Sequence, residues 1–314
     1  MTTPAPIEYT AYFAKGQAAY GTAATLANAN AIHLQSATIE EAGARGIDRS
    51  GVMTGLGGAA PPIQGDRYFN VTITAEFFLP ETVGDSSDWA TGPLWEACPV
   101  TIADVAATSV TVSPKRTMVP MTDWVPLTFS AQTANGLKRT AEDVMLVPTK
   151  IDATGGSIIV VEFSGVGTWT ADAAATLTAP AMPQGNLPLV ATNGCLVDGI
   201  VSGDADFGFV LETGLEVKPL RDTCETYGWG IPMLSSEGPA TLTYAALATA
   251  PYETARAAGA THNVVATFGA AVFNFPDAYI LNIDRGETDG AQTYTVVMHL
   301  VRTASTPEWN IVMT

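Results

Sequence analysis

One order of elements occurs twice along the chain, and it constrains the fold more than any other feature of the sequence. The first copy has a strand-like segment at residues 32–41, a Gly/Pro-rich loop at 42–65, an alternating strand at 66–78 and a short helix at 92–98. The second copy has a strand at 207–217, a loop that runs to residue 238, a strand at 240–247 and a helix at 251–258. A chain that makes one strand–loop–strand–helix unit twice is typical of a protein that tiles a surface, rather than of one built around a single catalytic cleft.

Apolar residues recur mostly with a period of two, which predicts a β-rich protein. The strand at 66–78 places Phe69, Val71, Ile73, Ala75 and Phe77 on one face, and Asn70, Thr72, Thr74 and Glu76 on the other. The strand at 207–217 places Phe207, Phe209, Leu211, Leu215 and Val217 opposite Val210, Glu212 and Glu216. In each strand one face therefore packs against a core, and the other faces water or a neighbour.

The remaining elements are also mostly strands. Further strands are predicted at 125–132, 144–150, 157–163 (buried on both faces), 262–273, 278–284 and 292–302, and helices at 11–19 and 251–258. The predicted fold class is a β-dominated α+β chain with few short helices, in two related strand–loop–strand–helix halves. Its predicted parts are residues 1–172, a linker or surface insertion at 173–203, and residues 204–314.

The charge of the chain is low in amount and acidic in sign. Charged residues are 14% of the 314, the formal net charge is −17 and the pI is about 4.3. A surface poor in charge favours association of copies, although a compositional bias of the genome explains the alanine excess equally well. The acidic balance argues against gripping nucleic acid, which requires Lys and Arg against phosphates. It permits DNA to pass without binding, and ordinary solubility charge is the plainer explanation.

Candidate chemistry is sparse. Cys98, Cys195 and Cys224 lack the spacing of a zinc site, and Cys98 is expected to be a small buried hydrophobe. The segment 84–87 is interpreted as a turn rather than a serine-esterase motif, and the segment 204–206 as a hairpin turn rather than a calcium loop. The N-terminus lacks the features of a signal peptide, and no apolar run approaches the ~18 residues of a membrane span. These observations predict a protein that is not an enzyme, uses no cofactor or metal, contacts no membrane and is made in a reducing cytoplasm.

The order of short motifs resembles the tail tube proteins of long-tailed bacteriophages. The segment Tyr20-Gly21-Thr22 is similar to the "YGT" element that precedes the first strand in that family, and Gly92-Pro93-Leu94-Trp95-Glu96-Ala97-Cys98 is similar to its "GPLLxACG" helix, with Pro99 where glycine is usual. The segments at 45–49, 55–58, 65–67, 75–77 and 155–169 continue the likeness in order, so that it covers residues 20–302. Each motif alone is unspecific, and the resemblance rests on their order and spacing.

The resemblance implies a β-sandwich or barrel core and a structural role. In that family, six subunits form a ring, and the rings stack into a hollow tube through which the genome leaves the capsid. Each half of the subunit would add a pair of antiparallel strands to a barrel around the lumen, which removes exposed sheet edges. The implied partners are further copies of the chain, the tape-measure protein, and tail terminator and baseplate proteins. The implied location is the virion tail, assembled in the host cytoplasm, with DNA passing through unbound.

Three sets of residues are candidates for these roles. The lumen-facing candidates, taken from the polar faces of the paired strands, are Asn70, Thr72, Thr74, Glu76, Glu212 and Glu216. The ring-stacking candidates, from a loop expected to become ordered on the adjacent ring, are Arg45, Asp48, Arg49, Leu56 and Ile63; the plainer interpretation of this loop is a mobile surface loop. The subunit-packing candidates, from the more apolar second loop, are Tyr227, Trp229, Ile231 and Met233. A one-residue slip in register would invert the lumen-facing set.

Two other interpretations stay open from the sequence. One is another acidic, β-rich virion protein, such as a capsid-decoration protein or a different tail protein. The other is an extracellular carbohydrate-binding β-sandwich, which would require clustered aromatic residues and a secretion route. The six Trp residues are instead spread along the chain, as core or interface anchors would be.

Overall fold

The computed structural model describes residues 9–43, 67–115, 125–133, 136–154, 158–174, 180–181, 187–188, 195–197, 200–201, 208–219, 232–236, 238–247, 252–288, 291–303 and 306–314. The protein is built there mainly from antiparallel strands, so the prediction of a β-dominated fold with few short helices is confirmed. The first strands are β1 (Tyr9–Gly16), β2 (Ser36–Ala42), β3 (Tyr68–Glu76), β4 (Val100–Val105), β5 (Ser109–Pro114), β6 (Leu127–Thr133), β7 (Leu137–Ala153), β8 (Val160–Thr168) and β9 (Ala173–Ala174).

The later strands are β10 (Cys195–Val197), β11 (Ile200–Val201), β12 (Phe209–Glu212), β13 (Leu215–Pro219), β14 (Pro232–Ser236), β15 (Thr241–Leu247), β16 (Thr261–Phe268), β17 (Ala271–Thr288), β18 (Ala291–Leu300) and β19 (Asn310–Met313). The α-helices are α1 (Gly92–Glu96) and α2 (Tyr252–Ala258), and two 3₁₀ turns are η1 (Asn28–Asn30) and η2 (Ser86–Asp88).

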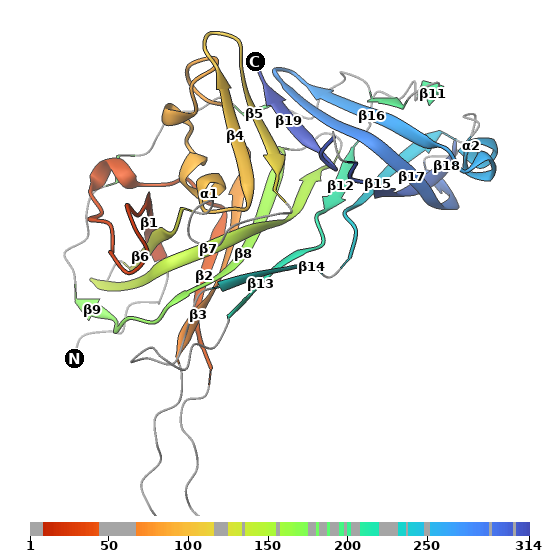
Figure 1. The fold of residues 1–314 in the computed structure, drawn as a ribbon. Helices are drawn as coiled ribbons and strands as arrows, with labels where there is room; N and C mark the ends of the chain where they lie inside the picture. Colours follow the sequence, from red (N-terminus) through yellow and green to blue (C-terminus); the bar gives the residue numbers. More distant parts are fainter. Residues whose placement is uncertain are drawn as a thin grey trace, which may run out of the picture.

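Two long strands, β7 and β17, organise the sheet, because each pairs with two different strands along one edge. One edge of β7 pairs first with β6, which leads to β1, and then with β12. Its other edge pairs with β8, which leads to β3 and β2. Strand β17 pairs with β16 on one edge, and with β19 and β18 on the other. The connections β12–β15–β18 and β4–β5–β19 then join the two ends of the chain into one hydrogen-bonded assembly (Figure 1).

A chain of aromatic rings crosses the core between these parts. The indole of Trp95, in α1, lies edge-on to the rings of Phe77 and Phe163, at centroid distances of 6.3 and 5.3 Å. Phe77 in turn contacts Phe273 of β17 at 5.7 Å, and Phe273 contacts Phe209 of β12 at 5.2 Å. These contacts place residues from both ends of the sequence in one continuous core, where edge-on aromatic pairs add to the free energy of burial.

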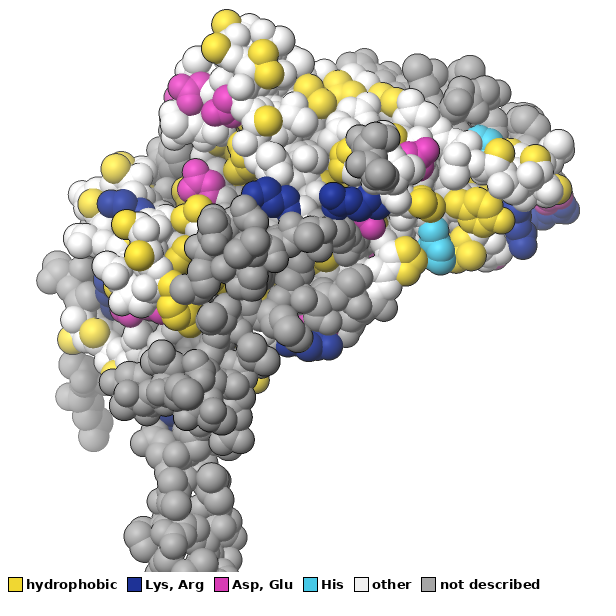
Figure 2. All heavy atoms as spheres, viewed as in Figure 1, with side chains coloured by type: hydrophobic (Ala, Val, Ile, Leu, Met, Phe, Trp, Pro, Cys, Tyr) yellow, Lys and Arg dark blue, Asp and Glu magenta, His cyan; other side chains and the backbone are white. Residues whose placement is uncertain are grey.

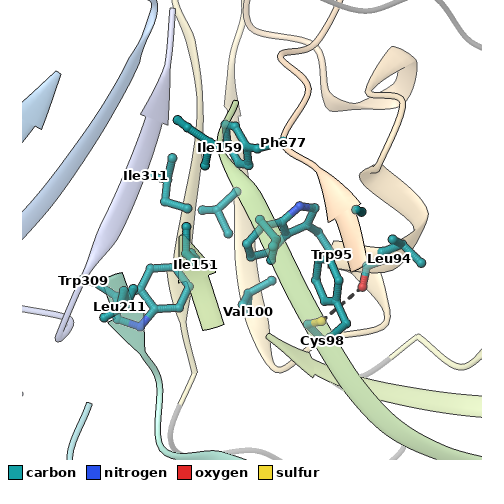
Figure 3. Close-up of a cluster of buried hydrophobic side chains, with 14 of the residues drawn as sticks. Phe77, Leu94, Trp95, Cys98, Val100, Ile151, Ile159, Leu211, Trp309 and Ile311 are labelled. Carbon is teal, nitrogen blue, oxygen red and sulfur yellow. Dashed lines mark hydrogen bonds between the residues drawn. The ribbon is translucent and has the colours of Figure 1, made fainter. Parts of the chain in front are cut away.

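The small helix α1 presses one side of its turn into this core. Figure 3 shows Trp95 and Cys98 pointing toward Val100 and Ile151, with Trp309 and Ile311 arriving from the C-terminal end. The thiol of Cys98 is buried and donates to the carbonyl of Leu94 at 3.1 Å. Burial raises the pKa of this thiol well above its ordinary value. The prediction that Cys98 is a small buried hydrophobe is therefore confirmed.

The alternation predicted for the first copy is confirmed. In β3 the side chains of Phe69, Val71, Ile73 and Ala75 are at most 1% exposed, while Asn70 and Thr72 are exposed and Thr74 and Glu76 are half-buried. The helix predicted at 92–98 is α1, and β2 pairs with β3 in the expected hairpin from Ser36↔Thr74 to Ala42↔Tyr68. The period-two pattern was sufficient here because one face of the hairpin is in the core.

The second copy differs from its prediction at Thr213 and Gly214. The segment predicted as a single strand at 207–217 is divided there into β12 and β13, and Gly214 has a φ of +62°. Strand β12 pairs with β15, whereas β13 leaves the main sheet and pairs with β14. Consequently Leu215 and Val217 do not share the core of Phe209 and Leu211; they pack in a smaller cluster with Met145, Val147 and Val166.

Three other predicted elements are wrong. The segment predicted as a helix at 11–19 overlaps β1 over residues 11–16, because pairing with β6 and burial of Ala11 and Phe13 outweigh the helix propensity of its alanines. The single strand predicted at 262–273 is a hairpin of β16 and β17, which turns at Gly269 with a φ of +58°. The strand predicted at 157–163 is buried on one face at this point: Ile159, Val161 and Phe163 are buried, and Val160 and Glu162 are half-buried.

Candidate functional surface

The face of the sheet opposite the core carries an unbroken row of polar side chains. Directly opposed residues of β2, β3, β8, β7, β12, β15, β18 and β17 form this central row, which reads Ser36, Thr74, Glu162, Lys150, Glu212, Thr241, His299 and Tyr279. Opposed residues of an antiparallel sheet project from the same face. None of these side chains is buried, so the row crosses these strands on their outer side, and Thr261 of β16 continues it beyond Tyr279.

A second row runs beside the central row. It reads Glu76, Val160, Asp152, Val210, Thr243, Val297 and Asn282, from β3 to β17. We call the face that carries both rows, together with Asn70 and Thr72 of β3, the polar face. Its charged members in the two rows are mostly carboxylates, with Lys150 as their one lysine or arginine.

Lys150 is the most constrained side chain of the polar face. Its ammonium group lies 3.0 Å from the Asp152 carboxylate and 3.7 Å from that of Glu162, and Glu212 stands directly opposite on β12. The hydrogen bond to Asp152 raises the pKa of Lys150 above its ordinary value, with further support from the charge of Glu162. Burial alone would raise the pKa of Asp152, but hydrogen bonds from Thr154 and Lys150 outweigh it and hold the pKa below the usual range.

A shallow hollow of about 510 Å³ opens on the same part of the polar face. It is lined by Gln35, Thr74, Asp152, Thr154, Ile158, Val160 and Glu162. Ile158 and Val160, which are half-buried, form the apolar part of its lining beside the carboxylates of Asp152 and Glu162. A second hollow, of about 310 Å³, lies between η1, η2 and the start of α1, and its lining includes Ala14, Ile32, Asp88 and Trp89.

The lumen-facing candidates are brought together in part. Asn70, Thr72, Thr74 and Glu76 lie side by side on β3, and Glu212 joins them on the polar face through the central row. Glu216 does not, because it belongs to β13, where it pairs with Lys218 at 2.8 Å. Strand β13 lies over Met145, Val147 and Val166, at one end of the polar face. The sequence could not show this displacement, which follows from the break at Gly214.

The other two candidate sets lie outside what the structure describes. The ring-stacking candidates Arg45, Asp48, Arg49, Leu56 and Ile63 fall between β2 and β3, in residues that are not described. The same holds for Tyr227, Trp229 and Ile231 among the subunit-packing candidates. Met233 is part of β14, where its backbone pairs with Lys218, and its side chain is not described. The roles of both sets remain predictions.

Sequence reasoning missed the residues at the centre of the polar face. Lys150, Asp152 and Glu162 are distant from Glu212 in sequence, and only the pairing of β7 with both β8 and β12 makes them neighbours. A weak signal was present, since Lys150 and Asp152 share a face of one strand, and Glu162 interrupts an apolar segment. Figure 2 shows how sparsely Lys, Arg, Asp and Glu side chains are distributed on one side of the molecule, in small separate groups among uncharged ones.

A buried carboxylate holds the segment that resembles the "YGT" element. Asp143 of β7 accepts from the backbone N–H of Gly21 at 2.7 Å and from the hydroxyl of Thr168 at 3.2 Å. Asp143 is only 5% exposed. Burial raises the pKa of its carboxyl group above the ordinary value, although both hydrogen bonds oppose the shift. Asp143 and Gly21 both have positive φ, at 50° and 75°. The arrangement is a structural tether between β7, β8 and the segment after β1.

The segment at 84–87 forms the turn that the sequence predicts. Asp85 accepts from the backbone N–H of Ser87 at 2.9 Å and caps η2, and Ser86 donates its hydroxyl to Asp104 at 2.8 Å. A hydroxyl that donates to an exposed aspartate lacks the histidine base of a serine nucleophile. Within the described ranges, no group of three or more His, Cys, Asp and Glu side chains is placed to hold a metal ion.

Comparison with models of known protein families and with curated proteins gives no match. In the described part of the chain, neither helix combines the length and apolar character that crossing a membrane requires.

Proposed function

We propose that this chain is a structural virion protein, whose copies assemble as hexameric rings that stack into the hollow tail tube of a long-tailed phage and form the conduit for its genome. The observation that carries the proposal is the polar face. Paired strands from β2 to β17 that bury apolar side chains on one face and carry the central polar row on the other have the form that a wall segment of a wide, water-filled barrel requires.

Open sheet edges support association between copies. In the described part of the chain, β2 pairs only with β3, and β4 only with β5. Such edges expose unpaired backbone N–H and C=O groups, which a second chain can satisfy by continuing the sheet. The net charge of −17 opposes association of copies at low ionic strength, so this edge contact is expected to strengthen as added salt screens the repulsion. Pairing β2 of one subunit with a strand of the next would extend the polar face around a ring.

Exposed apolar residues on β17 and just after β18 fit the same role. Tyr279 and Leu281 of β17 are 39% and 44% exposed, and Val301, just after β18, is 42% exposed. Tyr279 belongs to the central row on the side remote from β2, where Thr261 of β16 lies directly opposite it as the next strand. In the proposed ring the exposed apolar side chains would be covered by the neighbouring subunit, which would remove their apolar surface from water.

Negative-stain electron microscopy of the purified full-length chain tests the proposal. Rings, or hollow tubes made of stacked rings, are the expected result, with the subunit number given by the rotational symmetry of ring averages. A protein that stays monomeric at every concentration, or that coats a capsid shell without forming rings, would exclude a tail tube. The second outcome would instead favour a capsid-decoration protein.

A further inference from the structure

Of the side chains in the two rows of the polar face, Lys150 is the one lysine or arginine, and carboxylates lie next to it. Lys150 lies at the centre of the two rows, and the side chains around it are Asp152 on its own strand, Glu162 on β8 and Glu212 on β12. Both adjacent strands thus place a carboxylate directly opposite the same lysine. The local charge of these four groups is −2, from three carboxylates and one ammonium.

Two ion pairs engage the ammonium group of Lys150 and would compete with any further anion. The lysine side chain is 32% exposed, and the contacts of 3.0 Å to Asp152 and 3.7 Å to Glu162 occupy its ammonium from two sides. Asp152 is itself held in place by the backbone N–H of Thr154 at 3.2 Å. The carboxylate is therefore aimed at the lysine by its own turn, and is not a freely rotating surface group.

We infer that Asp152, Glu162 and Glu212 mask Lys150 so that the polar face does not bind the phosphate backbone of nucleic acid. A lysine on a neutral polar sheet would contact phosphate and release counterions, which retains a polyanion at that point. Paired with Asp152 and Glu162, and with Glu212 directly opposite on β12, the same lysine is already neutralised. These acidic side chains would therefore determine that the polar face does not retain nucleic acid. The inference rests on the proposed function only in taking the passing polyanion to be DNA.

Binding of a short DNA duplex to the full-length chain tests the masking. The variant D152N/E162Q/E212Q replaces the three carboxylates by amides of nearly the same shape and leaves Lys150 unmasked. The matched control E40Q/E76Q/D284N also removes three negative charges from the polar face, but none of its sites is directly opposed to Lys150 or shares its strand. Fluorescence anisotropy of a labelled duplex, titrated with each protein over a range of salt concentrations, gives the affinity and its salt slope.

The unmasked variant is expected to bind DNA about tenfold more tightly than the control at low salt, with a log–log salt slope steeper by about one. Adding K150Q to the unmasked variant is expected to abolish that gain. Equal binding by both triple variants would overturn the inference, because net charge alone would then explain the gain. Retention of the gain after K150Q, or no gain at all in a variant with wild-type circular dichroism, would overturn it too.

The result is separable from the test of the proposed function. Light scattering of each sample records its state of assembly alongside the binding measurement. If wild-type protein forms tubes and the unmasked variant shows no gain in DNA binding, the masking is refuted and the tail-tube proposal stands. If the protein stays monomeric and the unmasked variant binds DNA through Lys150, the tail-tube proposal is refuted and the masking stands.

Discussion

Among single residues, Asp143 combines an unfavourable environment with a favourable set of contacts. Its carboxylate is buried, which disfavours the charged form, yet it satisfies the backbone N–H of Gly21 and the hydroxyl of Thr168. Its φ of 50° is one that Asn and Asp tolerate better than other residues with a side chain. The effect of its charge on stability can therefore be measured separately from the effect of its hydrogen bonds.

Replacement of Asp143 by Asn is expected to retain the fold, because an amide can accept from Gly21 and donate to Thr168 after the hydroxyl turns. Asp143→Ala removes both hydrogen bonds and is expected to lower the free energy of unfolding by about 1–3 kcal/mol. Urea denaturation of the two variants and the wild type measures the difference. An Asp143→Ala protein as stable as Asp143→Asn would contradict the tether.

The pH dependence of stability gives a second, independent test of Asp143. Because burial raises its pKa in the folded state, the folded protein takes up this proton more readily than the unfolded chain. The destabilisation caused by burying the charged carboxylate is present in full above the raised pKa. It disappears as the pH falls toward 3.8, the ordinary pKa of Asp. The stability of wild type relative to Asp143→Asn should therefore rise on acidification. A constant or opposite difference across a series of urea titrations would refute this assignment.

Trp95 is the residue whose loss should be most costly in the core. It is fully buried and contacts Phe77, Phe163 and Trp89. Trp95→Ala is expected to cost about 3–5 kcal/mol, since the cavity between α1 and the sheet cannot close. Val83→Ala, at a side chain 46% exposed, serves as the control and should change stability by less than about 0.5 kcal/mol. Similar midpoints for both variants in urea would show that α1 is not part of the cooperative core.

At the scale of elements, the break between β12 and β13 decides where the second copy of the repeat goes. Gly214 has positive φ, and a Cβ added there would lie 2.6 Å from the carbonyl oxygen of Gly238. The backbone turns at this point, so that β12 stays in the sheet and β13 covers Met145 and Val147 on its outer side. A side chain at residue 214 would oppose both the turn and the close approach.

Gly214→Ala is accordingly expected to destabilise the protein more than Gly269→Ala. Gly269 has a similar φ of +58°, but its added Cβ would meet nothing within 4 Å, so this variant isolates the cost of alanine at positive φ, about 1–2 kcal/mol. The contact with Gly238 should add at least as much again at residue 214. Thermal unfolding of both variants measures the two costs, and equal losses would show that the turn at Gly214 adapts without strain.

For the whole molecule, the pairing scheme predicts that the N-terminal part cannot complete its core alone. Strand β7 needs β12 along its last residues, and Val112 of β5 is paired with Ile311 of β19. A chain ending at residue 172 would leave these edges and the ring of Phe77 uncovered. It is expected to lack a cooperative unfolding transition by near-UV circular dichroism. A sharp transition in that fragment, like that of the full chain, would contradict this expectation and identify an independent domain.

Much of the element list could be predicted from alternation, and the errors have identifiable causes. The hairpin of β2 and β3 was predicted because one of its faces lies in the core, which imposes the period of two. The segment of β1 was mistaken for a helix because its alanines favour that structure locally, whereas distant β6 supplies its pairing. Both errors at glycines, Gly214 and Gly269, come from turns that interrupt a sustained apolar pattern.

By itself the sequence determined the fold class, the buried face of β3, the character of Cys98 and an acidic, charge-poor surface, because these depend on local periodicity and composition. Only the tertiary structure decided which strands adjoin. It placed Glu212 beside Lys150, moved Glu216 onto β13, and formed two rows of side chains from segments distant along the chain. The physical reason is that register and strand order arise from pairing between remote segments. The amino-acid pattern of one strand shows which face is buried, but it does not specify which strand is the partner.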